Sequence, residues 1–177
     1  MGKALDSITV SSTGSKNSEL SVRRRKGRSV NAVADYLRSH LRVPNVYIAP
    51  SGMSRVDVLA ADAAGSGDIH AVSVEVLTTP MGTHGLKLYI DLVKRLPAHY
   101  KYLAIPKGIT NVMHDTQLFF AADGIGRVGV FLVSESIDLS PTVELAIKPE
   151  RFRLPADELA QVERYLDRAK PDMFVRV

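Results

Sequence analysis

The sequence lacks cysteine and tryptophan altogether, and only 6% of its residues are aromatic. The absence of cysteine excludes disulfide bonds, thiolate metal sites and a cysteine nucleophile, and it is typical of a cytoplasmic protein. With so few aromatic residues, a platform on which nucleic-acid bases stack is not indicated. No apolar run approaches the roughly 20 residues of a membrane-spanning helix, and the first residues lack the long apolar segment of a secretory signal. We therefore expect a cytoplasmic protein that has no membrane partner.

Charge is distributed unevenly along the 177 residues. The net charge is +4, with 45% apolar and 24% charged residues, which is ordinary for a globular protein. Residues 1–28 contain seven Lys and Arg residues against two acidic ones, so this segment carries +5 and the remainder −1. Because residues 1–20 are also rich in Ser, Thr, Gly and Asn, we interpret 1–28 as a flexible, disordered basic arm. Residues 29–177 are then one near-neutral domain.

The basic arm ends in the run RRRKGR, from Arg23 to Arg28. Clustered Arg and Lys displace counterions from a phosphate backbone, so this run predicts contact with nucleic acid. A solvated surface segment is the alternative interpretation of such a charge run.

Hydrophobic periodicity predicts an α/β protein. Apolar residues at three- and four-residue spacing predict helices from Ser29 to Pro44, over 86–96 and over 155–170, and residues 110–122 could form another. Short apolar, β-branched runs predict strands over 45–50, 55–61, 70–77, 100–106 and 127–134. Three successive strands indicate a meander, and the later alternation of strand and helix indicates parallel crossovers. We therefore expect a mixed central sheet of about five strands flanked by helices.

Two acidic residues stand inside strand-like apolar runs. Asp57 lies in VDVLAA and Glu75 in HAVSVEV, and the turn-rich segment AAGSGD joins the two runs. A carboxylate in such a run either faces solvent or is held in a polar site by a partner or a metal. Because the runs are predicted to be neighbouring strands of one hairpin, we expect the two acids to share a site. The alternative is a structural polar pair tied to Arg55, His70 or backbone donors.

This order of elements, with one acid on the second strand and one on the third, resembles the core of the PD-(D/E)xK nuclease-like superfamily, which has the restriction-endonuclease-like fold. The resemblance covers roughly residues 29–134 and leaves 155–170 as a C-terminal helical extension. In that family a first-helix acid, the second-strand Asp and a third-strand (D/E)xK motif surround one or two divalent cations. The resemblance implies that Asp57 and Glu75 are catalytic residues that bind Mg²⁺.

Two positions depart from the family pattern. Leu77 occupies the place of the motif lysine, two residues after Glu75. The first-helix acid would fall near Asn31, and Asp35, one turn later, could take its place as a metal ligand. The motif lysine orients or deprotonates the attacking water and offsets developing charge, so its loss would leave a weak catalyst. A relocated lysine could restore these roles, and Lys87, on the helix after the third strand, is the candidate.

Three functions remain open on the sequence. The first, which we favour, is a nucleic-acid-binding protein, for DNA foremost, with a nuclease-like fold and a degenerate catalytic site. It could act as a homodimer or with a protein partner. The second is an active Mg²⁺-dependent endonuclease, and the third is a protein-interaction module that binds no nucleic acid. The residues predicted to contact nucleic acid are Arg23, Arg24, Arg25, Lys26, Arg28, Lys87, Lys94 and Arg95.

Overall fold

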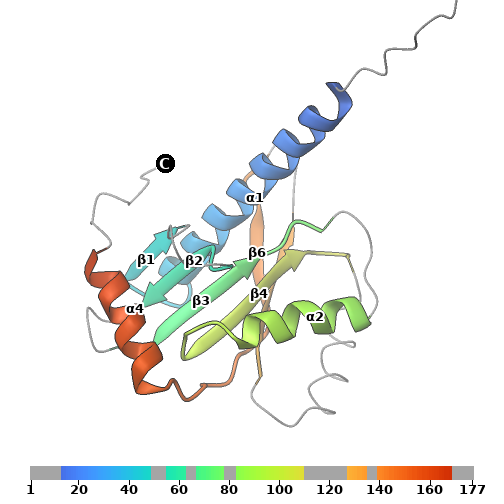
Figure 1. Cartoon of the computed structure of the whole chain (residues 1–177). Coiled ribbons are helices and arrows are strands. Elements are labelled where there is room, and N and C mark those ends of the chain that lie inside the picture. Colours follow the sequence, from blue (N-terminus) through green and yellow to red (C-terminus); the bar gives the residue numbers. More distant parts are fainter. Residues whose placement is uncertain are drawn as a thin grey trace, which may run out of the picture.

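The computed structural model describes residues 13–48, 55–62, 67–77, 83–109, 127–134 and 139–168. Within this part of the chain, six strands form one sheet and three helices pack on its two faces (Figure 1). The strands are β1 (Asn45–Ile48), β2 (Val58–Ala61), β3 (Ile69–Val74), β4 (Tyr100–Pro106), β5 (Gly129–Ser134) and β6 (Thr142–Ile147). The helices are α1 (Thr13–Ser39), α2 (Thr83–Lys94) and α4 (Ala156–Arg168). The predicted α/β class, a mixed sheet flanked by helices, is confirmed.

The strands lie in the sheet in chain order, from β1 to β6. The first three are antiparallel to one another, as the predicted meander requires. β3 and β4 are parallel, with α2 between them in sequence, and β5 is parallel to β4. β6 was not predicted, and it pairs antiparallel with β5 at the edge of the sheet. The mixed sheet therefore has six strands rather than about five.

α1 covers one face of the sheet through a stripe of small and branched apolar side chains. Val33, Ala34 and Leu37 are fully buried there, together with Val30 one turn earlier. They pack against alternate residues of the strands, including Phe131 of β5. Each fully buried Val or Leu contributes about 1.5–3 kcal/mol relative to an exposed side chain, so this stripe fixes α1 firmly on the sheet.

α2 and α4 cover the opposite face. Leu86, Ile90 and Val93 of α2 are buried against that face, as their spacing predicted, and Val162 of α4 belongs to the same core. The two helices lie over different parts of the sheet, with α2 beside β4 (Figure 1). Among the described residues, no helix is long and apolar enough to cross a membrane.

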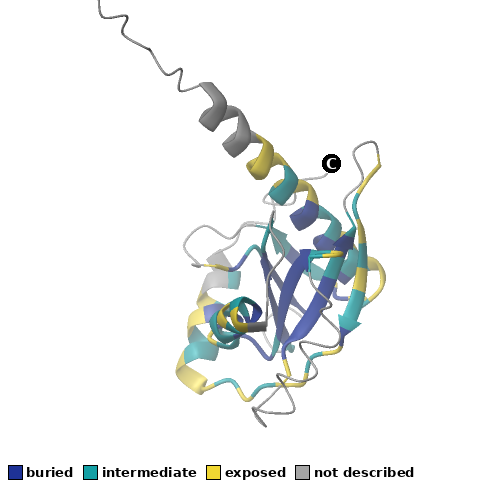
Figure 2. Cartoon of the chain, turned by 90° about the vertical axis from the view of Figure 1, so that its right-hand side faces the viewer, coloured by how far each residue is buried: buried dark blue, intermediate teal, exposed yellow. Residues whose placement is uncertain are grey.

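The structure corrects the predicted basic arm. α1 begins at Thr13, not at Ser29, so the run from Arg23 to Arg28 is helical and continuous with the segment that packs on the sheet. Lys and Arg are good helix formers, and a helix that is anchored by tertiary packing at one end readily extends through such residues. Residues 21–24 of α1 are exposed, and Figure 2 shows this turn beyond the part of the helix that packs on the sheet. Residues 1–12 and the candidate helix over 110–122 lie outside the described residues.

Candidate functional site

Asp57 and Glu75 lie at the same end of the sheet. Asp57 directly precedes β2 and Glu75 directly follows β3, so both residues flank strand ends rather than strand centres. β2 and β3 are antiparallel, with Val58 opposite Val72, and the start of β2 therefore meets the end of β3. This is also the carboxyl end of the parallel strands β3 and β4, where α/β sheets commonly bind ligands. The hairpin thus brings the two predicted acids together.

Asp57 is part of the sheet's hydrogen bonding. Its Oδ2 accepts a hydrogen bond of 2.7 Å from the backbone N–H of Val74, and its side chain is only 16% exposed. The next residue, Glu75, donates its N–H to the carbonyl of Ala104 on the β4 side, so the N–H of Val74 faces β2. The carboxylate therefore supplies the acceptor that a backbone carbonyl supplies elsewhere in the ladder. This hydrogen bond matches the alternative in which backbone donors hold the acid.

A lysine from α1 completes the site. Lys26 Nζ lies 2.9 Å from Asp57 Oδ1. Lys26 also lowers the pKa of Glu75 electrostatically, so its ammonium acts on both carboxylates. We call Lys26, Asp57 and Glu75 the acid–lysine cluster. It unites a residue of the predicted nucleic-acid-binding run with two of the three predicted metal ligands.

Lys87 was the candidate for a relocated lysine, and the structure pairs it with another residue of its own helix. Lys87 lies on α2, where its Nζ is 3.7 Å from Asp91 Oδ2 one turn along the helix. Lys26 was assigned to the basic arm instead, although its spacing from the apolar residues of α1 indicates that it faces the sheet. It lies four residues before Val30 and seven before Val33, and therefore falls on the stripe of α1 that faces the sheet.

The side chain of Glu75 is partly buried. Burial raises its pKa above the ordinary carboxyl value, and the charge of Asp57 acts in the same direction. Lys26, Arg55 and a 3.3 Å hydrogen bond donated by Ser73 Oγ to Glu75 Oε1 act in the opposite direction. A desolvated carboxylate next to a second acid is a site at which additional positive charge is favoured.

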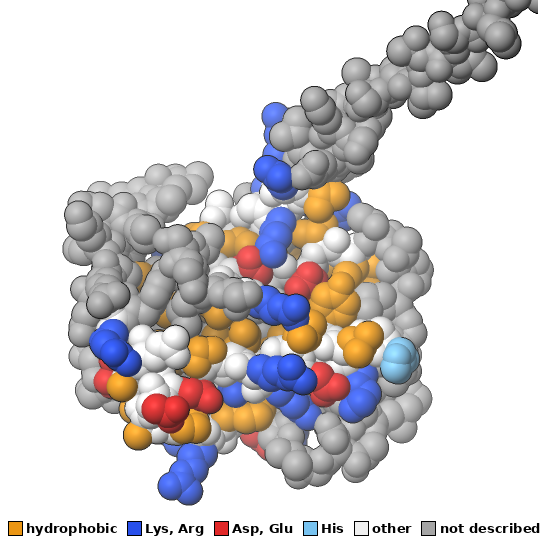
Figure 3. All heavy atoms as spheres, viewed as in Figure 1, with side chains coloured by type: hydrophobic (Ala, Val, Ile, Leu, Met, Phe, Trp, Pro, Cys, Tyr) orange, Lys and Arg blue, Asp and Glu red, His pale blue; other side chains and the backbone are white. Residues whose placement is uncertain are grey.

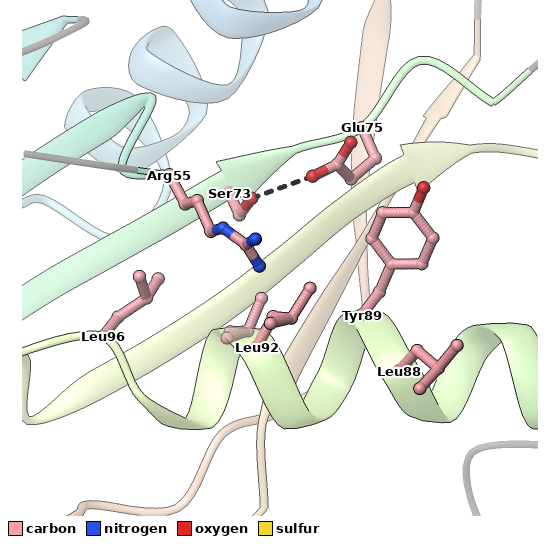
Figure 4. A pocket seen from close by; sticks show the side chains of 8 residues that line it. Arg55, Ser73, Glu75, Leu88, Tyr89, Leu92 and Leu96 are labelled. Carbon is pink, nitrogen blue, oxygen red and sulfur yellow. Dashed lines mark hydrogen bonds between the residues drawn. The ribbon is translucent and has the colours of Figure 1, made fainter.

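A pocket of about 390 Å³ opens beside Glu75, between β3 and α2 (Figure 4). Its lining residues are Arg55, Ser73, Glu75, Leu88, Tyr89, Leu92, Val93 and Leu96. In Figure 4 the guanidinium of Arg55 reaches across the strands toward Leu92, while the hydroxyl of Tyr89 lies on the Glu75 side. Arg55 has a φ of 68°, a left-handed conformation that costs a non-glycine residue energy and often marks functional positions.

The third predicted metal ligand is not brought into the cluster. The side chain of Asp35 is 75% exposed and pairs with Arg38 at 3.1 Å. In the described ranges, no three His, Cys, Asp or Glu residues are grouped so that they could hold a metal ion together. Leu77, at the place of the motif lysine, packs against the core beneath α2 and α4. The site therefore offers two carboxylates and a lysine from a different element.

The remaining basic residues lie on α1, at the end of α2 and directly after α2. Arg23 and Arg24 are exposed on α1, whereas Arg28 donates a hydrogen bond to the carbonyl of Leu139. Arg95 is exposed directly after α2. Figure 3 shows acidic side chains in the middle of the drawn face, with basic side chains above and below them and hydrophobic ones beside them. Basic and acidic side chains are therefore interspersed on this face.

Comparisons with known proteins identify no family. No family model matches the chain, and no curated protein matches it. One solved structure that it resembles is the SPO1766 protein of unknown function from Silicibacter pomeroyi. The identity is 14% and the TM-score 0.48, over 80% of this chain and 83% of that one. At this level of similarity, the comparison adds no argument about function.

Proposed function

We propose that the protein binds nucleic acid, and DNA foremost, through the end of the sheet where Asp57 and Glu75 meet α1. The observation that carries this proposal is the 2.9 Å contact between Lys26 Nζ and Asp57 Oδ1. This contact joins the basic stretch of α1 to the acid pair in one site. A site with an ammonium, two carboxylates and further cations nearby suits a phosphodiester, whose charge the cations offset directly or through a bound metal ion.

The exposed turns of α1 supply the sequence-independent part of such binding. Arg23 and Arg24 lie within one turn of Lys26 on the same helix, and both are exposed. Phosphate contacts from Lys and Arg release counterions and dominate the affinity for nucleic acid at low salt. A nucleic-acid strand whose phosphates contact these turns of α1 would therefore reach the acid–lysine cluster at the sheet.

The topology supports membership of the PD-(D/E)xK nuclease-like superfamily as a proposal. The order α1–β1–β2–β3–α2–β4, an antiparallel meander followed by a parallel crossover, is the order on which the resemblance rests. Asp57 and Glu75 also lie at one end of the sheet, as a shared metal site requires. The missing lysine and first-helix acid support a divergent member.

The donor set fits one Mg²⁺ ion that is shared with a phosphate. Mg²⁺ in proteins is commonly held by one or two carboxylates together with water and substrate phosphate oxygens, so a third protein carboxylate is not required. Asp57 Oδ1 and the carboxylate of Glu75 would hold the ion, which would polarise the phosphodiester when bound. Lys26 would offset the charge of the phosphodiester, and the hydrogen bond from Val74 N–H would orient the carboxylate of Asp57.

An active metal-dependent endonuclease is the second candidate, and Lys26 is the observation that favours it. A lysine beside the two acids can orient a water molecule and offset developing charge, which are the roles that Leu77 cannot fill. Lys26 thus replaces Lys87 as the candidate relocated lysine.

Fluorescence anisotropy with labelled DNA at several salt concentrations tests the binding proposal. Removal of one phosphate-binding cation should reduce the slope of log affinity against log salt by about one, so Arg23→Ala together with Arg24→Ala should flatten it. The matched control removes two exposed arginines from the α4 region, Arg153→Ala together with Arg164→Ala, and should leave the slope unchanged. Equal effects of the two pairs, or no affinity at low salt, would contradict the proposal and leave the protein-interaction module.

Incubation with supercoiled plasmid and Mg²⁺ or Mn²⁺ separates the two candidates. An active nuclease would nick the plasmid, and Lys26→Met or Glu75→Gln should lower the rate by about 100- to 1000-fold, the usual loss for one such electrostatic group. Lys148→Met is the matched control, because it removes an exposed lysine that directly follows β6, next to the start of β5 and away from the acid–lysine cluster. Absence of nicking together with retained DNA binding would support the degenerate site.

A further inference from the structure

We propose that the pocket beside Glu75 receives one unpaired nucleobase, so that the preferred ligand of this protein is single-stranded nucleic acid. This inference rests on the proposed function, because the base would belong to a strand whose phosphate lies at the acid–lysine cluster. Glu75 belongs both to that cluster and to the wall of the pocket, so the two sites are adjacent. In a nucleotide the phosphate and the base are likewise neighbours, separated by one sugar.

The lining of the pocket suits a flat heteroaromatic ring. Leu88, Leu92 and Tyr89 form an apolar wall from α2, and Ser73 and Glu75 place polar atoms on the strand side. Bases bind proteins by stacking on aromatic or guanidinium planes and by hydrogen bonds at their edges. A platform of several aromatic side chains is not needed for this, because one tyrosine and one arginine suffice for a single base.

Two side chains of the wall are placed where a bound base would contact them. Leu88 is 54% exposed and lines the pocket together with Leu92 and Tyr89, so it presents apolar surface to a bound ring. Arg55 holds its guanidinium over the pocket from a left-handed backbone conformation that glycine would adopt more readily. A base seated between these side chains would cover the leucine and stack against the guanidinium.

The size and position of the pocket argue against a paired duplex. A volume of about 390 Å³ lies near the lower end of the range for small-ligand sites, roughly 300–1,000 Å³, which suits one base rather than a stretch of strand. A base stacked within a duplex cannot enter such a pocket unless it is first turned out of the helix, at a cost of a few kcal/mol. A single strand does not incur this cost.

The test measures binding of a labelled single-stranded oligonucleotide and of the same sequence as a blunt duplex, by anisotropy at one salt concentration. The full-length protein should bind the single strand more tightly. Leu88→Ala should weaken single-strand binding by at least about fivefold, the lower end of the effect of losing one stacked base, and leave duplex binding unchanged. Leu139→Ala, at an exposed leucine outside the pocket, is the matched control and should change neither affinity.

Arg55→Gly provides a second variant that is compatible with the local backbone, because glycine adopts the φ of 68° without steric cost. It should also weaken single-strand binding by at least about fivefold. Arg42→Gly is its control, with the same charge change at another exposed residue of positive φ, 57°, and should have no such effect.

The outcomes separate the base pocket from the binding function. Equal affinity for both ligands, tighter duplex binding, or unchanged single-strand binding in Leu88→Ala and Arg55→Gly would overturn the base pocket while leaving nucleic-acid binding intact. Absence of binding to either ligand would overturn both proposals.

Discussion

Substitution of Asp57 should separate the structural role of this residue from its charge. Asp57→Ala removes both the acceptor for the Val74 N–H and the partner of Lys26. Asp57→Asn removes the charge but keeps a side-chain oxygen at the same place. The asparagine variant should therefore remain close to the wild type in stability, and the alanine variant should not.

The expected losses of unfolding free energy follow from how far the Val74 hydrogen bond and the Lys26 ion pair are buried. An orphaned, partly buried N–H costs about 1–3 kcal/mol, and this cost applies to Asp57→Ala alone. The ion pair contributes at most about 1 kcal/mol, because the side chain of Lys26 is 42% exposed and solvent screens the interaction. We expect Asp57→Ala to be less stable than Asp57→Asn by about 2 kcal/mol, or roughly 4–8 °C in melting temperature for a chain of this length.

Urea unfolding followed by far-ultraviolet circular dichroism measures this gap, since the chain has no tryptophan for fluorescence. Hydrogen exchange at the Val74 amide provides a local measurement, and exchange should be faster in Asp57→Ala than in Asp57→Asn. Equal stability of the two variants, with equal protection of Val74, would refute the assignment of Asp57 to the hydrogen-bond ladder.

Three further predictions concern Glu75 and two glycines. Burial raises the pKa of Glu75 above its ordinary value of 4.5, so the folded wild type should become less stable as the pH rises from 4.5 through the raised pKa. Urea unfolding midpoints measured at several pH values should show this decrease in the wild type and not in Glu75→Gln. Gly129→Ala should destabilise by about 1–3 kcal/mol in thermal melts, because its Cβ would lie 2.5 Å from the Tyr102 ring. Gly27→Ala should stabilise by about 0.5–1 kcal/mol, because that helical position has open space; a lower melting temperature would contradict this.

Much of the fold could be predicted because burial imposes periodicity on the sequence. In α1 the three- and four-residue spacing identified Val30, Val33 and Leu37 as the face that packs on the sheet. β4 has the predicted bounds, Tyr100–Pro106, since its central residues are buried on both sides and read as one apolar run. The pairing of the acids followed from the hairpin, because antiparallel neighbours bring the start of one strand to the end of the other.

β6 was missed because an edge strand is only partly buried. Val143 and Leu145 pack in the core on the α1 side, whereas Ile147 packs in the core on the opposite face, and a register shift interrupts the pairing with β5 between them. The strand therefore lacks a continuous alternation of apolar and polar residues. The strand is stabilised by its pairing with β5, which is a tertiary interaction. The local pattern of residues therefore provided little reason to predict it.

Lys26 and the pocket depend on how distant elements meet. Composition suggested that the residues before Ser29 were disordered, whereas packing of the following turns carries the helix back to Thr13. The lysine then reaches Asp57, which lies 31 positions later in the sequence. Leu88 and Tyr89 come beside Glu75 only because α2 packs on the sheet. Sequence periodicity identifies the faces of a helix but not the partner residues across a gap.

An NMR titration tests the central claim most directly. Backbone amide shifts of the full-length protein would be followed while a short single-stranded DNA is added. We predict that the largest changes occur at Lys26, Asp57, Val74 and Glu75, and that the amides of α4 remain unchanged. Saturable changes confined to α4, or no changes at any amide, would contradict the claim that the acid–lysine cluster is the nucleic-acid site.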